Sequence, residues 1–255
     1  MKEENDTFYT RCLLFLPVLL ILYVGLYCST QPVQASTYPL QTKYPNTIIY
    51  KAQTKQKIIA LTFDDGPDNR FTPLILDVLK KYDVKATFFL LGTRVHSYPY
   101  ITKRIYNEGH VIGNHTFWHP NLTNFGANKM AWEIEKNEQE IISIIGVKSD
   151  LFRAPYGAIN EQLIIHLEKM GYRHIGWSVD SEDWKSLSSD EVKRNVLNSI
   201  HPGAIVLMHS AGHWTQDLTG TVNALNELIP YLKKKGYTFV TLPELWSIEH
   251  SHLGN

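Results

Sequence analysis

The sequence predicts an α/β fold built on a largely parallel β-sheet. From Lys57 onward, short apolar runs rich in β-branched and aromatic residues alternate with longer segments that have helical spacing. Strands that alternate with helices need crossover connections, which are typical of parallel sheets. The chain has 255 residues, of which 44% are hydrophobic, so it is long enough to bury one sizeable core. Seven such units could close into a barrel or remain an open, doubly wound sheet.

The expected strands are short runs dominated by aliphatic and aromatic residues. The first and the sixth are apolar almost throughout, which is typical of strands buried on both faces. In chain order, the strands are expected at residues 58–63, 86–91, 110–113, 151–153, 174–179, 204–208 and 237–241.

The expected helices lie between these strands and several carry end signals. Ser188 and Glu191 have the spacing of a capping box, and four glycines stand just past the last turn of a helix, at positions 109, 146, 171 and 236. Trp132 is expected on the buried face of its helix, and Trp246 in packing near the C-terminus. The helices are expected at residues 73–82, 100–108, 128–145, 161–170, 190–200 and 222–235.

The first 35 residues differ from the rest and predict export. An uncharged apolar run at residues 12–27 follows a basic head, and its length lies between that of a signal-peptide core and that of a membrane span of about 20 residues. Small residues before position 36 suit cleavage after Ala35. We therefore expect residues 1–35 to be a signal peptide or membrane anchor, residues 36–55 a linker, and residues 56–250 an extracytoplasmic catalytic domain, either anchored at the cell surface or secreted.

Charge and cysteine content exclude several classes of protein. Lys plus Arg and Asp plus Glu are equal at 25 each, so nothing indicates a nucleic-acid partner or disorder. Both cysteines, Cys12 and Cys28, lie in or beside the export segment, so the remainder can form neither a disulfide nor a zinc-thiolate site. Lipid attachment at Cys28 is disfavoured because the large Tyr27 precedes it. We expect a monomer.

Polar residues follow the expected strands at their carboxyl ends. In a parallel α/β fold these ends meet on one face, where functional groups gather. The residues are Asp64 and Asp65 after the first strand, His115 and His119 after the third, Arg153 at the end of the fourth, Asp180, Asp183 and Trp184 after the fifth, and His209 at the end of the sixth.

His115 and His119 have the spacing of two neighbouring imidazoles on a helical turn or a tight loop. The pair lacks the glutamate of the zinc-protease motif, so that kind of peptidase chemistry is not supported. With one carboxylate added, the two histidines would form a common hydrolytic zinc site.

Asp64 and Asp65 can supply that carboxylate, and a second carboxylate then remains. On an extended segment the two side chains would point in opposite directions. One could therefore bind the cation while the other faces a water. An aspartate that forms a turn before Gly66 is the alternative.

The remaining candidates also have two interpretations. His209 ends a strongly apolar strand and is either a core histidine or a proton donor to a leaving group. Arg153 either makes a surface ion pair or orients an active-site carboxylate. Tyr156 and Trp184 suit the faces of sugar rings, or belong to the core.

Five motifs in order, "TFDDGP", "HTFWH", "RAPYG", "DSEDW" and "LMHS", resemble those of the polysaccharide deacetylase (NodB homology) family, carbohydrate esterase family 4. The resemblance covers residues 57–246. It implies a distorted (β/α) barrel of seven or eight strands and one divalent metal ion. Zinc is the expected ion, and cobalt or another divalent ion would suit the same donors.

The resemblance also implies a role for each matching residue. Asp64 would be the catalytic base, and Arg153 would hold it. Asp183 would tune the catalytic acid His209. The metal ligands would be Asp65, His115 and His119, the acetyl group would sit against Trp184 and Leu207, and the backbone N–H of Tyr156 would stabilise the oxyanion.

These roles imply hydrolysis of the N-acetyl group of N-acetylglucosamine residues in a cell-wall polysaccharide. The export segment favours peptidoglycan. A chitin-oligosaccharide deacetylase, an O-acetyl xylan esterase and a catalytically silent carbohydrate-binding protein are the alternatives, although a silent protein would be expected to lack the base or a ligand. His213 and Trp214 lie in a part that is variable in the family and receive no role.

Overall fold

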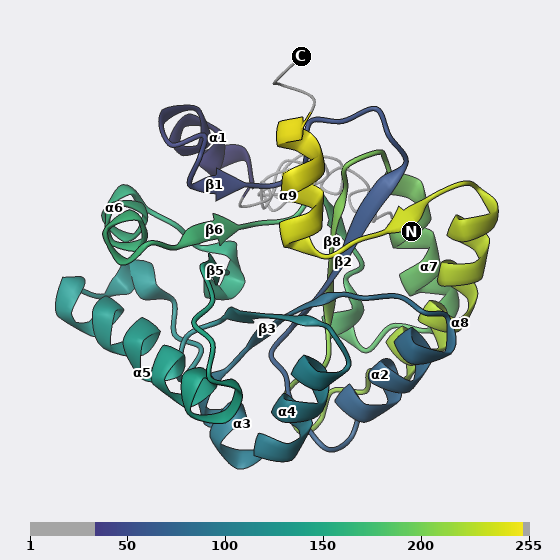
Figure 1. Cartoon of the computed structure of the whole chain (residues 1–255), viewed down its shortest axis with the longest axis horizontal. Coiled ribbons are helices and arrows are strands. Elements are labelled where there is room, and N and C mark those ends of the chain that lie inside the picture. The colour runs from purple at the N-terminus through teal and green to yellow at the C-terminus, as the bar shows by residue number, and fades with distance from the viewer. Residues whose placement is uncertain (1–33, 252–255) are drawn as a thin grey trace, which may run out of the picture. The chain divides into compact units, whose positions relative to one another are not determined.

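The computed structural model describes residues 34–251, and it is built on a nine-stranded parallel sheet that curls into a half-barrel (Figure 1). The order along the sheet is β1-β6-β5-β4-β3-β2-β8-β7, and β9 pairs with β2. This confirms a barrel of the type that the motifs implied. The strands are β1 (Ile48–Ile49), β2 (Ile58–Asp64), β3 (Thr87–Leu90), β4 (Val111–Asn114), β5 (Leu151–Phe152), β6 (Arg173–Ile175), β7 (Val179–Asp180), β8 (Ile205–His209) and β9 (Thr238–Phe239).

Helices surround the outside of the curled sheet (Figure 1). The predicted capping box of Ser188 and Glu191 is present, and the glycines at 109, 146, 171 and 236 all have positive φ. The α-helices are α1 (Gln34–Lys43), α2 (Thr72–Lys81), α3 (Gly92–Ser97), α4 (Pro99–Asn107), α5 (Ala127–Ile145), α6 (Glu161–Met170), α7 (Ser189–Ser199), α8 (Thr219–Lys234) and α9 (Leu242–Ser251), and three short 3₁₀ turns are η1 (Leu122–Asn124), η2 (Pro155–Gly157) and η3 (Asp183–Lys185).

Strand β2 lies in the middle of the sheet and is buried on both faces. Ile59, Leu61 and Phe63 pack against the helices that cover the outer face, whereas Ile58 and Ala60 belong to the core cluster inside the barrel. Because side chains alternate along a strand, Asp64 continues the inward-facing series. The apolar run of β2 therefore delivers a carboxylate to the interior of the barrel at its carboxyl end.

The expected strand at residues 174–179 is two strands, which is a correction. β6 and β7 lie near opposite ends of the strand order, on the two sides of the opening of the half-barrel. The residues between them connect the two strands across this opening. There the Gly176 N–H donates to the carbonyl of Ile49 (2.7 Å) and the Ser178 N–H to that of Ile205 (3.0 Å). A side chain at Gly176 would meet the ring of Tyr50 at 2.2 Å. The sequence could not distinguish the two cases, because apolar residues line both a strand and a crossing inside a core.

The range expected to be a linker, residues 36–55, contains ordered structure. Helix α1 ends at Lys43, β1 pairs with β6, and Ile48 and Ile49 are buried. A two-residue strand is too short to show a periodic pattern, so β1 could not be predicted. The expected export segment lies outside the described residues. Within residues 34–251, no helix is long and apolar enough to cross a membrane.

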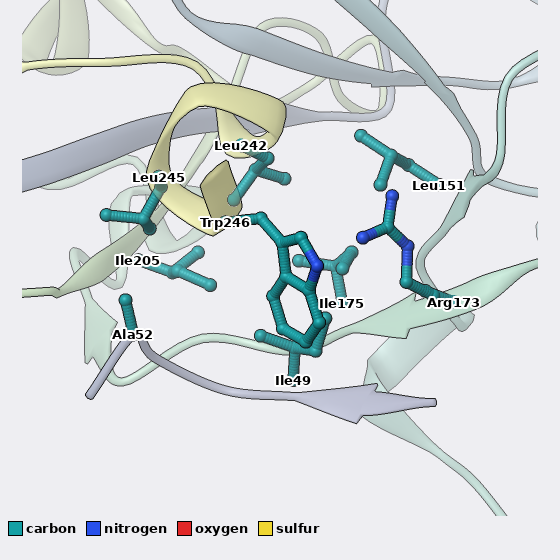
Figure 2. Close-up of a pocket in the computed structure, with 9 residues that line it drawn as sticks. All are labelled: Ile49, Ala52, Leu151, Arg173, Ile175, Ile205, Leu242, Leu245 and Trp246. Atoms are coloured by element: carbon teal, nitrogen blue, oxygen red, sulfur yellow. The ribbon is translucent and has the colours of Figure 1, made fainter. Parts of the chain in front are cut away.

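Helix α9 closes the end of the barrel where the strands begin. Figure 2 shows a small pocket between this helix and the strands, where Leu242, Leu245 and Trp246 face Ile175 and Arg173. The guanidinium of Arg173 lies 5.2 Å from the centre of the Trp246 ring. Trp246 thus packs as expected. Trp132 does not, because 42% of its surface is exposed.

Candidate active site

The carboxyl ends of the strands bring the predicted polar residues together. In the register of β2 and β8, Asp64 lies opposite His209. His115 directly follows β4, and Arg153 directly follows β5. The expectation that these residues share one end of the barrel is therefore met, and α9 closes the other end.

The two adjacent aspartates lie on the same side of the chain, not on opposite sides. Asp65 is not extended, because its φ of 67° is in the left-handed region. The turn brings both carboxylates towards His115, whose Nε2 lies 3.4 Å from Asp65 Oδ1 and 3.8 Å from Asp64 Oδ2. The turn-forming role that was the alternative belongs to Asp68, whose Oδ1 accepts the N–H groups of residues 70, 71 and 72.

Asp65, His115 and His119 form a cluster that could hold a metal ion. Asp65 Oδ1 lies 3.4 Å from His115 Nε2 and 3.3 Å from His119 Nε2. Bonds of about 2.0–2.1 Å to a tetrahedral zinc ion would separate the ligand atoms by about 3.3 Å. Asp65 Oδ1 is also buried without a hydrogen-bond partner among the described residues. The residues present therefore fit one divalent cation.

The protonation of the histidines supports the same conclusion. His115 Nδ1 lies 2.8 Å from the carbonyl oxygen of Arg153, which can only accept, so Nδ1 carries the proton and Nε2 is free to bind a cation. Burial lowers the pKa of His119 to about 4, so its ring is neutral. Burial opposes the charge of Asp65, but the adjacent His115 and the charge of His209 outweigh it and lower the pKa of Asp65 below its usual range. Burial opposes the charge of His115, but the carboxylates of Asp64 and Asp65 outweigh it and raise its pKa. One carboxylate oxygen and two imidazole nitrogens thus converge on a point where positive charge is favoured, as it is around a bound metal ion.

Arg153 is fully buried and holds Asp64. Its Nη1 donates to Asp64 Oδ1 (2.7 Å) and to Thr62 Oγ1 (2.8 Å). Its other donors bind the carbonyls of Ile175 (2.9 Å), at the end of β6, and Gly176 (3.0 Å), in the segment that leads from β6 to β7. Of the two interpretations of Arg153, the structure supports the one in which it orients a carboxylate.

Asp183 holds His209 through two contacts. Its Oδ1 lies 2.7 Å from His209 Nδ1, and its Oδ2 accepts the His209 N–H (2.9 Å) and the Thr221 hydroxyl (2.8 Å). Burial alone would lower the pKa of His209, but the charge and hydrogen bond of Asp183, together with the charges of Asp65 and Asp64, raise it to about 9. His209 is therefore a cation at neutral pH and has a proton to give.

The three residues expected to contact substrate surround this cluster. The ring of Tyr156 lies 4.7 Å from the ring of His119, with 63% of the residue exposed. Trp184 follows Asp183 and is half-exposed. Leu207 is buried on β8, two residues before His209, so it faces the same side of the strand.

Glu133 adjoins this site, although it was not among the predicted site residues. It lies on α5 and is 1% exposed, and its Oε2 accepts the N–H groups of Phe117 (3.1 Å) and Trp118 (2.9 Å). These residues lie between the two histidine ligands. Lys129 pairs with the other oxygen of Glu133 at 2.8 Å. Glu133 lies three residues after Met130 and next to Ile134, on the buried stripe of α5, so a charged residue at a buried helical spacing was the available signal.

Comparison with known proteins identifies relatives along most of the chain. A family model described as polysaccharide deacetylase matches residues 51–175. A peptidoglycan-N-acetylglucosamine deacetylase of Bacillus cereus is 47% identical over 190 residues, which are 74% of this chain and 68% of that protein. The peptidoglycan-N-acetylmuramic acid deacetylase PdaA of Bacillus subtilis is 38% identical and is covered to 74% of its length.

A solved structure agrees with these relatives. The crystal structure of the Bc1960 peptidoglycan N-acetylglucosamine deacetylase, in complex with 4-naphthalen-1-yl-N-oxidanyl-benzamide, is 43% identical with a TM-score of 0.78, over 81% of this chain and 96% of that chain. The chain therefore belongs to the polysaccharide deacetylase family, carbohydrate esterase family 4, and is a hydrolase that acts on amide bonds.

Proposed function

We propose that the protein removes the N-acetyl group from N-acetylglucosamine residues of peptidoglycan, in a metal-dependent hydrolysis that releases acetate and leaves glucosamine. One observation carries this proposal: three candidate cation ligands share one end of the barrel with a carboxylate that is held by Arg153 and a histidine that is held by Asp183. A base, an acid and a cation site are the groups that metal-dependent hydrolysis of an amide requires.

Asp65, His115 and His119 would hold the cation, and zinc is the ion that we propose. When bound, it would polarise the acetamide carbonyl and lower the pKa of a nearby water. Two imidazoles and one carboxylate would suit zinc or cobalt equally, and availability would decide between the two ions.

The chain's own residues would move the protons. Asp64, fixed by Arg153, accepts a proton from the attacking water, whose oxygen bonds to the carbonyl carbon. The backbone N–H of Tyr156 stabilises the negative charge that develops on the carbonyl oxygen, an effect worth about 2.7–4 kcal/mol per donor. His209 then donates its proton to the nitrogen as the carbon–nitrogen bond breaks. The products are an amine on the sugar and acetate.

The choice of substrate rests on the relatives. Two similar proteins are named for deacetylation of N-acetylglucosamine or N-acetylmuramic acid in peptidoglycan. We propose that Trp184 and Leu207 contact the acetyl group. We also propose that residues 1–35 export the domain, where it would meet the cell wall either anchored at the surface or secreted.

The activity is tested by removing the metal with a chelator and restoring zinc. The reloaded protein is expected to release acetate from peptidoglycan, with the loss of one acetyl mass per modified sugar in mass spectrometry. Xylan that carries O-acetyl groups and chitin oligosaccharides serve as comparison substrates. Normal folding with no acetate release from any of them would refute the proposal.

The two aspartates are expected to fail in different ways. Asp64→Asn keeps the ligands but cannot accept a proton, so turnover should fall by at least about 10²-fold while zinc stays bound. Asp65→Ala removes a ligand, so zinc itself should be lost. Metal content by atomic absorption and acetate release, measured on both variants, check the division. The reverse pattern would show that the roles are exchanged.

A further inference from the structure

The loop between β8 and α8, residues 210–217, presents a tryptophan that the proposed reaction does not use. Trp214 has 78% of its surface exposed. A single exposed aromatic residue is common on protein surfaces and indicates nothing by itself. Trp214 differs from such residues because hydrogen bonds hold the backbone of its loop in place.

Two arginines bind the backbone carbonyls of the loop. Arg70 donates from Nη1 to the carbonyl of Trp214 (3.0 Å) and from Nη2 to that of His213 (3.3 Å), and Arg94 donates to that of Gly212 (2.6 Å). Within the loop, the side-chain oxygen of Gln216 accepts the N–H of His213 (2.5 Å). The backbone on both sides of Trp214 is therefore fixed.

The arginines are themselves fixed by a buried carboxylate. Asp68 Oδ2 lies 3.4 Å from Arg70 Nε and 4.0 Å from Arg94 Nη1, and Asp68 is 3% exposed. The other oxygen of Asp68 accepts backbone N–H groups at the start of α2. A charged network thus connects the loop to the segment that follows Asp65.

The same loop adjoins the catalytic groups. It begins directly after His209, and Thr72 donates a hydrogen bond to the Ser210 carbonyl (2.8 Å). Gln216 Nε2 donates to the carbonyl of Trp184 (2.7 Å), so the loop is attached to the residue proposed to contact the acetyl group. Trp214 therefore lies on the same edge of the barrel as the acid and the acetyl pocket.

We propose that Trp214 is a preformed stacking platform for a sugar ring of an extended glycan, at least one residue beyond the sugar that loses its acetyl group. One face of a pyranose ring presents C–H groups with partial positive charge, and the indole face carries partial negative charge. An indole on a fixed backbone binds such a ring with little loss of conformational freedom. Trp214 is thus a specificity residue for long chains, an inference that rests on the proposed deacetylase function.

Activity on N-acetylglucosamine oligomers of increasing length tests this inference. For Trp214→Ala we expect kcat/KM on the hexasaccharide to fall roughly five- to tenfold, mainly through KM, with a smaller loss on the disaccharide. Trp214→Phe should recover most of the loss, because it keeps an aromatic face. Tyr231→Ala, which truncates a half-exposed aromatic residue near the other end of α8, is the matched control.

Binding measured without turnover separates this inference from the proposed reaction. The metal-free protein is titrated with the same oligomers, and the heat of binding is followed. An affinity that rises with length in the wild type and loses that rise in Trp214→Ala supports the platform, even if no acetate is released. An equal loss at every length, or no loss at any length, overturns it.

Discussion

At the scale of single residues, His209 depends on one neighbour for its proposed role as an acid. Burial by itself would lower its pKa, and Asp183 is the largest influence that opposes burial. Asp183 also fixes the ring through Nδ1, which leaves Nε2 as the nitrogen that can face a leaving group.

Asp183→Asn should therefore move the alkaline limb of the pH profile. An acid must be protonated, and with a pKa of about 9 His209 keeps its proton through the neutral range. Without the charge of Asp183 the pKa falls, so kcat/KM should begin to decline at a pH lower by roughly 1–3 units. Asp190→Asn, which removes an exposed carboxylate on α7, should leave the limb in place. A shift of the acidic limb instead would contradict the assignment.

At the scale of elements, α5 sets the shape of the loop that carries the two histidine ligands. Glu133 holds the backbone of this loop at two consecutive N–H groups, and Asn114 Oδ1 accepts a third from Thr116 (2.9 Å). These bonds fix the loop, although neither Glu133 nor Asn114 is one of the three candidate ligands.

Glu133→Gln should therefore weaken zinc binding by about 10–100-fold. The amide keeps one acceptor oxygen but loses the charge that strengthens both bonds and pairs with Lys129. Competition with a chromophoric chelator measures the affinity. Saturating zinc should restore much of the turnover, and Glu135→Gln, on an exposed position of the same helix, should bind zinc like the wild type. Unchanged affinity in Glu133→Gln would refute the positioning role.

The same scale shows what the sequence could and could not predict. β2 and β8 were predictable because long apolar runs persist on both faces, and the candidate ligands could be singled out because they follow strands. Glu133 and Thr221 were not, since their roles arise from contacts between elements that are distant along the chain. The left-handed turn at Asp65 was also hidden, because an aspartate adopts it only in this context. Short elements such as β1 and α3 left no periodic signal.

At the scale of the whole molecule, the candidate cation site joins segments from separate parts of the barrel. Asp65 follows β2, whereas His115 and His119 follow β4. A cation that binds the folded state and not the separated segments stabilises the fold by mass action.

Zinc should therefore raise the melting temperature. At a free concentration 100 times its Kd, the stabilisation is about 2.7 kcal/mol, which corresponds to about 5–10 °C for a domain of this size. Differential scanning calorimetry with and without chelator measures it. Asp64→Asn should show the same increase and Asp65→Ala should not. An equal increase in both variants would place the stabilising zinc at another site.

Arg153 also determines the order in which activity and structure are lost. Its guanidinium donates to the carbonyls of Ile175 and Gly176, where the chain leaves β6 to cross the open side of the barrel. The same guanidinium also binds Asp64. Local opening of the chain at these two carbonyls would release Asp64 from Arg153 while the helices remain folded. Activity should thus be lost at a lower temperature than the one at which the helices unfold. Loss of activity would then measure the local opening of the barrel.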